Sequence, residues 1–207
     1  MKKLILVVAL AGLVSAKAQD KSKVFSATEI VWFGLDFTKA KFVGQFDQGM
    51  GAMPATGQDM KNKWIYQWNS LIVSEQQNFD MRKAFKKDNI YYDIATMNEL
   101  NQKIDAASCM VYNPGKIEKS SIDAMVKKYS SKDKKEVVGL AFVIENFDKG
   151  MQTASVYVTF FDIATKKVLL CEYMEGKAMG VGMRNYWAGS IKSILKQLGS
   201  GTFKSWQ

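Results

Sequence analysis

Residues 137–174 read VVGLAFVIENFDKGMQTASVYVTFFDIATKKVLLCEYM and contain three segments that are typical of β-strands. Val137–Ile144 is strongly apolar, Ser155–Phe161 alternates between two faces, and Val168–Met174 begins with aliphatic residues. Turn-forming residues separate the three segments, at Asp148–Gly150 and Asp162–Lys166. Because short connections join antiparallel neighbours, the sequence predicts a C-terminal antiparallel three-strand meander.

An amphipathic helix is predicted to follow the meander. Its apolar residues recur at i, i+4, i+7, i+8 and i+11, and this spacing places them on one helix face. They are Trp187, Ile191, Ile194, Leu195 and Leu198. We expect this face, with Trp187 at its start, to pack on the sheet as part of the core.

Strands and helices also precede the meander. Glu29–Phe37 is dense in β-branched and aromatic residues and predicts a buried strand, and Ile90–Ile94 predicts a shorter one. Capping-box patterns predict three helix starts, at Thr56–Asp59, Thr96–Glu99 and Ser120–Asp123. The first of these helices is expected to end near Asp88. This order predicts a single α/β (α+β) domain over residues 20–207, with a mixed sheet packed by amphipathic helices.

The first nineteen residues have the pattern of a secretory signal peptide. Met1–Lys3 is a short basic start, Leu4–Val14 is an unbroken run of apolar and small residues, and Ala16–Ala18 is an A-x-A cleavage site. We therefore expect a periplasmic or secreted protein, exported through a cleavable signal peptide over residues 1–19. No cysteine stands at the first mature position, so the pattern does not predict a lipoprotein.

The chain is basic, with a net charge of +9 at neutral pH. Signal removal would take away Lys2, Lys3 and Lys17 and lower the net charge to +6. A positive balance favours anionic partners such as lipid headgroups, glycans or acidic proteins. No later apolar segment reaches the roughly 18 residues of a transmembrane helix, so any membrane contact is expected to be peripheral.

The sequence contains no histidine and only two cysteines. The absence of histidine excludes Ser-His-Asp and Cys-His catalysis and every histidine-containing zinc site, and it disfavours an enzyme, although carboxylates, lysine or tyrosine could still act. We expect a protein that is not an enzyme, and no cofactor, since the sequence shows no catalytic or ligand motif. Cys109 and Cys171 could form a disulfide in an oxidising compartment. The alternative is two buried thiols, because both lie in segments that look like core.

Residues 176–182 carry the one candidate binding loop. Gly176, Gly180 and Gly182 precede the last helix, and Lys177 and Arg184 add positive charge. Such a loop could bind an anion at the helix N-terminus. The alternative is a strand-to-helix connection that needs glycine for its backbone conformation. The spacing matches neither the P-loop nor the dinucleotide-binding fingerprint.

The segments Ala154–Asp162 and Thr165–Leu169, followed by a glycine-containing loop and a helix, carry a family resemblance. This ending resembles the α/β domains of bacterial envelope proteins of the curli-secretion-channel (CsgG-like) and TolB-N-terminal-like kinds. Asn185–Gly189 is also similar to secreted Bacteroidetes proteins without an assigned activity. The channel-forming members are lipoproteins, and this chain lacks their cysteine. The resemblance therefore implies a binding or assembly module rather than a pore.

Together these observations predict a non-catalytic envelope protein that binds another macromolecule, either an envelope protein or a second copy of itself. The first alternative is a binding protein for a small anionic ligand that uses the loop at residues 176–182. A less favoured alternative is a carboxylate-based glycan hydrolase, although Asp36 and Asp162 at strand ends are better explained as turn formers. Nucleic acid is not an expected partner, because Trp64 and Trp68 lie on one apolar helix face.

Overall fold

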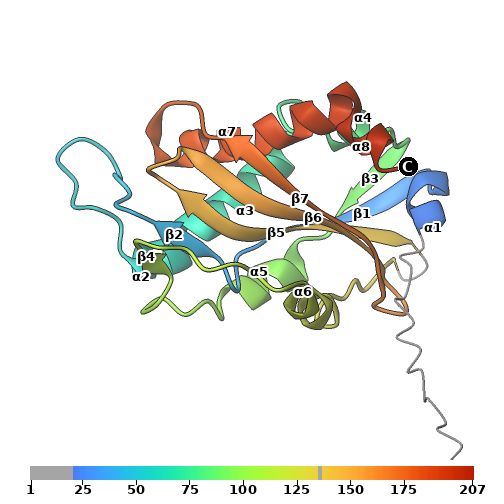
Figure 1. Cartoon of the computed structure of the whole chain (residues 1–207), viewed down its shortest axis with the longest axis horizontal. Helices are drawn as coiled ribbons and strands as arrows, with labels where there is room; N and C mark the ends of the chain where they lie inside the picture. Colours follow the sequence, from blue (N-terminus) through green and yellow to red (C-terminus); the bar gives the residue numbers. More distant parts are fainter. Residues whose placement is uncertain (1–20, 135–136) are drawn as a thin grey trace, which may run out of the picture.

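The computed structural model describes residues 21–134 and 137–207. They form a mixed α/β fold in which helices cover both faces of one seven-stranded sheet (Figure 1). The predicted fold class is confirmed. The predicted signal peptide, residues 1–19, lies outside the described residues.

The longest strand, β5 (Val138–Asp148), organises the sheet. On one side it pairs antiparallel with β6 (Thr153–Asp162), which pairs antiparallel with β7 (Val168–Lys177). The C-terminal meander is therefore confirmed. On its other side β5 pairs in parallel with β1 (Glu29–Asp36) and, further along, with β2 (Lys41–Val43).

Two short strands complete this side of the sheet. β3 (Asn89–Tyr92) runs parallel to β1, and β4 (Met110–Val111) runs parallel to β2. Because parallel neighbours need a crossover, helices connect these strands. The helical elements are α1 (Lys21–Ser26), α2 (Gly57–Asp59), η1 (Met60–Trp64), α3 (Ile65–Ser74), α4 (Met81–Phe85), α5 (Ala95–Asn101), α6 (Lys119–Val126), α7 (Gly182–Gln197), η2 (Leu198–Thr202) and α8 (Phe203–Ser205).

Alternation along the strands produces a core on each face of the sheet. Trp32 and Phe142 point into the larger core under α3, α4 and α7, whereas Phe33 and Val143 point into the smaller core under α5 and α6. Figure 1 shows the two helical layers on opposite sides of the sheet. Trp187 of α7 is 2% exposed, and its ring stacks on Phe147 with 4.9 Å between the centroids. The buried face predicted for the last helix is confirmed.

Three helix boundaries show which capping signals the fold uses. The Thr56–Asp59 capping box is present and opens α2. The predicted box at Thr96 is wrong, because α5 begins at Ala95 and the Thr96 hydroxyl donates to the carbonyl of Ser130 at 2.8 Å. The predicted cap at Ser120 is also wrong, since α6 begins at Lys119 without a side-chain cap. At Thr96 a tertiary contact has replaced the local capping pattern.

The helix expected to run from Thr56 to Asp88 is interrupted after Ser74. A turn follows α3, and Asp80 then opens α4 by accepting a hydrogen bond from the Lys83 amide at 2.9 Å. Strand β7 also extends further than predicted, so that Gly176 and Lys177 belong to the strand and the connection to α7 begins at Ala178.

Candidate functional site

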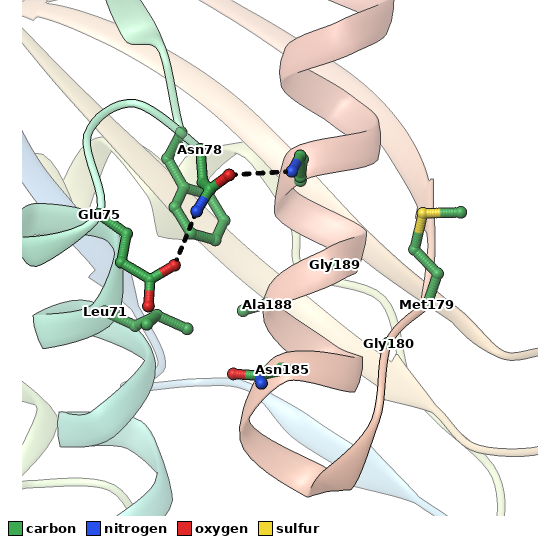
Figure 2. Close-up of a pocket in the computed structure, with 10 residues that line it drawn as sticks. Leu71, Glu75, Asn78, Met179, Gly180, Asn185, Ala188 and Gly189 are labelled. Atoms are coloured by element: carbon green, nitrogen blue, oxygen red, sulfur yellow. Dashed lines mark hydrogen bonds between the residues drawn. The ribbon is translucent and has the colours of Figure 1, made fainter.

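A surface hollow of about 490 Å³ lies between α3 and α7 (Figure 2). Its floor is Ala188 and Gly189 on α7, and Leu71 and Phe79 form the wall on the α3 side. The opposite wall is the β7–α7 connection, which contributes Met179 and Gly180. The lining is therefore mainly apolar, although it lies open to the surface.

Small residues on α7 allow this connection to lie directly on the helix. A Cβ atom on Gly189 would come within 2.0 Å of the Met179 carbonyl oxygen. A Cβ atom on Gly176 would come equally close to the carbonyl oxygen of Ser190. Gly180 has a φ of +129°, which favours glycine. The shape of the hollow thus depends on glycines of both the strand and the helix.

Two hydrogen bonds in series cross the hollow from the end of α3 to α7. The Asn78 amide donates to the carboxylate of Glu75 at 3.0 Å and accepts a hydrogen bond from the Lys192 ammonium at 3.3 Å (Figure 2). Asn78 therefore links the end of α3 to the exposed side of α7. At the other end of the hollow, Asn185 accepts a hydrogen bond from the Arg184 guanidinium at 3.2 Å.

A second hollow, of about 380 Å³, continues along α7 beyond Lys192. It shares Asn78 and Lys192 with the first, and its lining adds Ala84 and Leu195. Its remaining lining residues are Asp80, Lys83, Lys196, Gly199 and Ser200. We call the two hollows together the α7 groove. The lining of both hollows is mainly apolar, and three lysines, Lys83, Lys192 and Lys196, line the second.

The structure separates the five residues predicted for the glycine loop. Gly176 and Lys177 lie in β7, Gly180 lines the α7 groove, and Gly182 and Arg184 lie in the first turn of α7. Gly180 and Gly182 both have positive φ, as the connector alternative expects.

The first amides of this loop already donate hydrogen bonds within the fold. The Lys177 amide donates to the Ser193 hydroxyl at 3.3 Å, the Ala178 amide to the Gln152 carbonyl at 2.8 Å, and the Met179 amide to the Tyr186 carbonyl at 3.1 Å. These hydrogen bonds attach the segment between β7 and α7 to helix α7 and to the β5–β6 hairpin. Anion binding at this loop stays a prediction, and these three amides are not available for it.

Sequence reasoning missed a buried polar contact at the carboxyl end of β1. Asp36 is 1% exposed and accepts hydrogen bonds from the Thr38 amide at 2.7 Å, the Thr38 hydroxyl at 2.6 Å and the Tyr129 hydroxyl. Burial raises the pKa of Asp36 above its ordinary value, and the hydrogen bonds from Thr38 and Tyr129 oppose this shift. Burial and the neighbouring Asp36 also raise the pKa of Tyr129 well above its ordinary value.

The surroundings of Asp36 assign it a structural role. The bonds from Thr38 form the turn that the sequence predicted, and the bond from Tyr129 ties β1 to the segment after α6. A small hollow of about 150 Å³ beside it is rimmed by Lys39, Lys103 and Lys128. Asp162 accepts from the Thr165 amide at 2.8 Å and pairs with Lys23. The strand registers place Asp162 opposite Val138, the first residue of β5, and Asp36 opposite Val143, in the middle of that strand.

Both cysteines are free, buried thiols in the structure. Cys109 belongs to the larger core, whereas Cys171 belongs to the smaller core on the other face of the sheet. Burial raises the pKa of each thiol. Within residues 21–134 and 137–207, no group of three or more cysteine, aspartate or glutamate side chains could hold a metal ion.

No family model, curated protein or solved structure matches this chain. The resemblance to curli-secretion-channel (CsgG-like) and TolB-N-terminal-like domains therefore stays a prediction. The site has to be interpreted from its own geometry.

Proposed function

We propose that this protein is an exported, non-catalytic module that binds another envelope protein through the α7 groove. The bound element would be an acidic segment with apolar side chains. The observation that carries this proposal is a mainly apolar groove along α7 whose second hollow is lined by Lys83, Lys192 and Lys196 and is therefore rich in lysine.

The dimensions of the groove support a segment of polypeptide rather than a small molecule. The lining residues on α7 extend from Asn185 to Lys196, which corresponds to about 16 Å along the helix axis. That length accommodates about five residues of an extended chain. Recognition of this kind places apolar anchors in the hollow and lets charged groups at the rim set orientation.

Charge complementarity supports an acidic segment. Lys83, Lys192 and Lys196 line the second hollow, where Asp80 is the acidic lining residue. The excess of positive charge in the whole chain would speed association with an acidic partner at low salt. A second copy of this chain is also positively charged, so charge repulsion would oppose its binding in the groove.

Charge reversal in the groove tests this proposal. The double variant Lys192→Glu/Lys196→Glu should lose a partner that the unmodified protein retains from envelope extracts. The matched control Lys127→Glu/Lys132→Glu makes the same charge change at exposed positions on the other face and should retain it. A synthetic peptide from the retained partner should then bind in a salt-sensitive way. Equal retention by both double variants would contradict the proposal.

Export is a separate part of the proposal and has its own test. Protein isolated from the envelope fraction should begin at Gln19 or Asp20, because the A-x-A site ends at Ala18. N-terminal sequencing measures this directly, and an intact Met1 in that fraction would contradict it.

A further inference from the structure

Exposed apolar side chains gather at one end of the sheet. β2, β4, β5 and β7 all run in the same direction, because β2 is parallel to β4 and β5, and two antiparallel steps lead from β5 to β7. The segments that follow these four strands therefore emerge at the same end (Figure 1). We call them the end loops, residues 44–56, 112–116, 149–152 and 178–181.

Each end loop carries at least one large apolar side chain that faces solvent. Met50 is fully exposed and Val181 is 89% exposed, although core positions normally take such residues. The others are Met53, Tyr112, Met151 and Met179. Most of the strongly exposed large apolar side chains of the described residues thus lie on these loops.

Main-chain hydrogen bonds hold the end loops together. The Lys149 amide donates to the Val43 carbonyl at 3.0 Å, and the Gly44 amide donates to the Val111 carbonyl at 2.9 Å. The Ala178 amide donates to the Gln152 carbonyl at 2.8 Å. The bases of the four loops are therefore joined in series, and their apolar tips are presented together.

The charges beside these tips are mixed, with a small positive excess. Lys116, Lys149 and Lys177 lie in the end loops or directly next to them, against Asp47 and Asp148. The Asp47 carboxylate is paired with Lys149 at 3.3 Å, and the Asp148 carboxylate accepts a hydrogen bond from the Met151 amide at 2.9 Å. The end of the molecule thus combines apolar tips with a net excess of one positive charge, and the chain as a whole adds its own positive balance.

We propose that the end loops dock on the surface of an anionic phospholipid bilayer. Apolar side chains enter the region between headgroups and acyl chains, and lysine side chains attract the anionic headgroups. Separate tips that project from one end suit a soft, planar surface. In the part of the chain that the structure describes, no helix is long and apolar enough to span a bilayer. The segment 178–181 also forms one wall of the α7 groove, so the two proposed surfaces adjoin there.

Vesicle sedimentation tests this inference. The chain from Asp20 onward contains every described element and lacks the apolar segment Leu4–Val14, which could itself bind lipid. It should sediment with vesicles of phosphatidylcholine and phosphatidylglycerol, and much less with phosphatidylcholine alone. Equal binding to both vesicle types, or binding to neither, would overturn the proposal.

A set of variants separates the loop tips from overall charge. Replacing Met50, Met53, Met151 and Val181 with serine should weaken vesicle binding by about tenfold or more, without a change in net charge. The control Gln76→Ser/Gln77→Ser alters exposed residues at the end of α3 and should bind like the unmodified protein. The melting temperature of every variant should stay unchanged, because each replaced side chain is exposed. A serine variant that is folded and still binds fully would overturn the proposal.

A fluorescent probe then locates the contact. An environment-sensitive label on Met50→Cys should shift to shorter wavelength on mixed vesicles, whereas the same label on Gln76→Cys should not. Selective labelling is feasible because Cys109 and Cys171 are buried. A shift at position 76 and not at position 50 would overturn the proposed orientation.

Discussion

The Tyr129 hydroxyl donates a hydrogen bond to the buried carboxyl group of Asp36 and thereby joins the segment after α6 to the end of β1. The Tyr129→Phe variant removes this donor and leaves the other bonds of Asp36 in place. We expect the free energy of unfolding to fall by about 1–3 kcal/mol, the usual cost of losing a partner of a buried polar group. Denaturant titration measures this loss. The control Tyr112→Phe changes an exposed side chain and should have no effect; equal effects of the two substitutions would contradict the assignment.

The same carboxyl group should leave a signature in the pH dependence of stability. Burial raises the pKa of Asp36 in the folded protein, so the folded state binds its proton more tightly than the unfolded state does. The contribution of Asp36 to stability is therefore complete below the unfolded pKa and is lost as pH rises through the folded pKa. As pH rises from the unfolded-state pKa of Asp36 to its folded-state pKa, the free energy of unfolding of the unmodified protein should fall relative to that of the Asp36→Asn variant. Denaturant titrations of both proteins at a series of pH values measure this difference in the free energy of unfolding. A stability of the unmodified protein that rises with pH relative to the variant would contradict the expected sign.

Trp187 anchors α7 on the sheet. Besides Phe147, its ring approaches Phe46 with 5.0 Å between the centroids. We expect Trp187→Ala to lower the free energy of unfolding by about 3–5 kcal/mol, the range for emptying a large core site. The control Trp206→Ala replaces a half-buried ring near the chain end and should cost less. A loss below about 1 kcal/mol for Trp187→Ala would mean that this ring does not hold the helix in place.

The two thiols should be inert in the folded protein. Cys109 and Cys171 lie in different cores, and burial raises the pKa of both, so neither forms the reactive thiolate readily. A thiol reagent should react with both only at the rate of unfolding, and a reducing agent should leave the melting temperature unchanged. Rapid reaction of the native protein, or a fall in melting temperature on reduction, would contradict this expectation.

The sequence predicted the parts of the fold that local periodicity determines. The meander and the stripe from Trp187 to Leu198 are contiguous patterns, and short turns leave few alternatives for the strands. The placement of β1 and β2 along the same edge of β5 depends on parallel pairing between distant segments, which no local pattern encodes. The two-residue strand β4 is also too short to show a period.

The candidate site was less accessible to sequence reasoning for the same reason. The α7 groove exists because α3 and α7 meet over the same face of the sheet, and Ala188 and Gly189 show no special spacing in the sequence. Asp36 and Tyr129 are far apart along the chain, and their contact requires the crossover through α5 and α6. The segment predicted as a glycine loop spans the end of β7 and the start of α7, and the role of Met179 and Gly180 as a groove wall depends on Gly189 beneath them.

Site-specific photo-crosslinking from the α7 groove tests the central claim most directly. A photoreactive residue at Lys196, in the lysine-rich hollow, should form a specific adduct in intact envelopes, and mass spectrometry should place the crosslink in an acidic, partly apolar segment of one partner. The same residue at Lys127, on the other face, should not form this adduct. Adducts of the same partner from both positions, or a crosslinked segment without acidic residues, would contradict the assignment of the groove as the binding site.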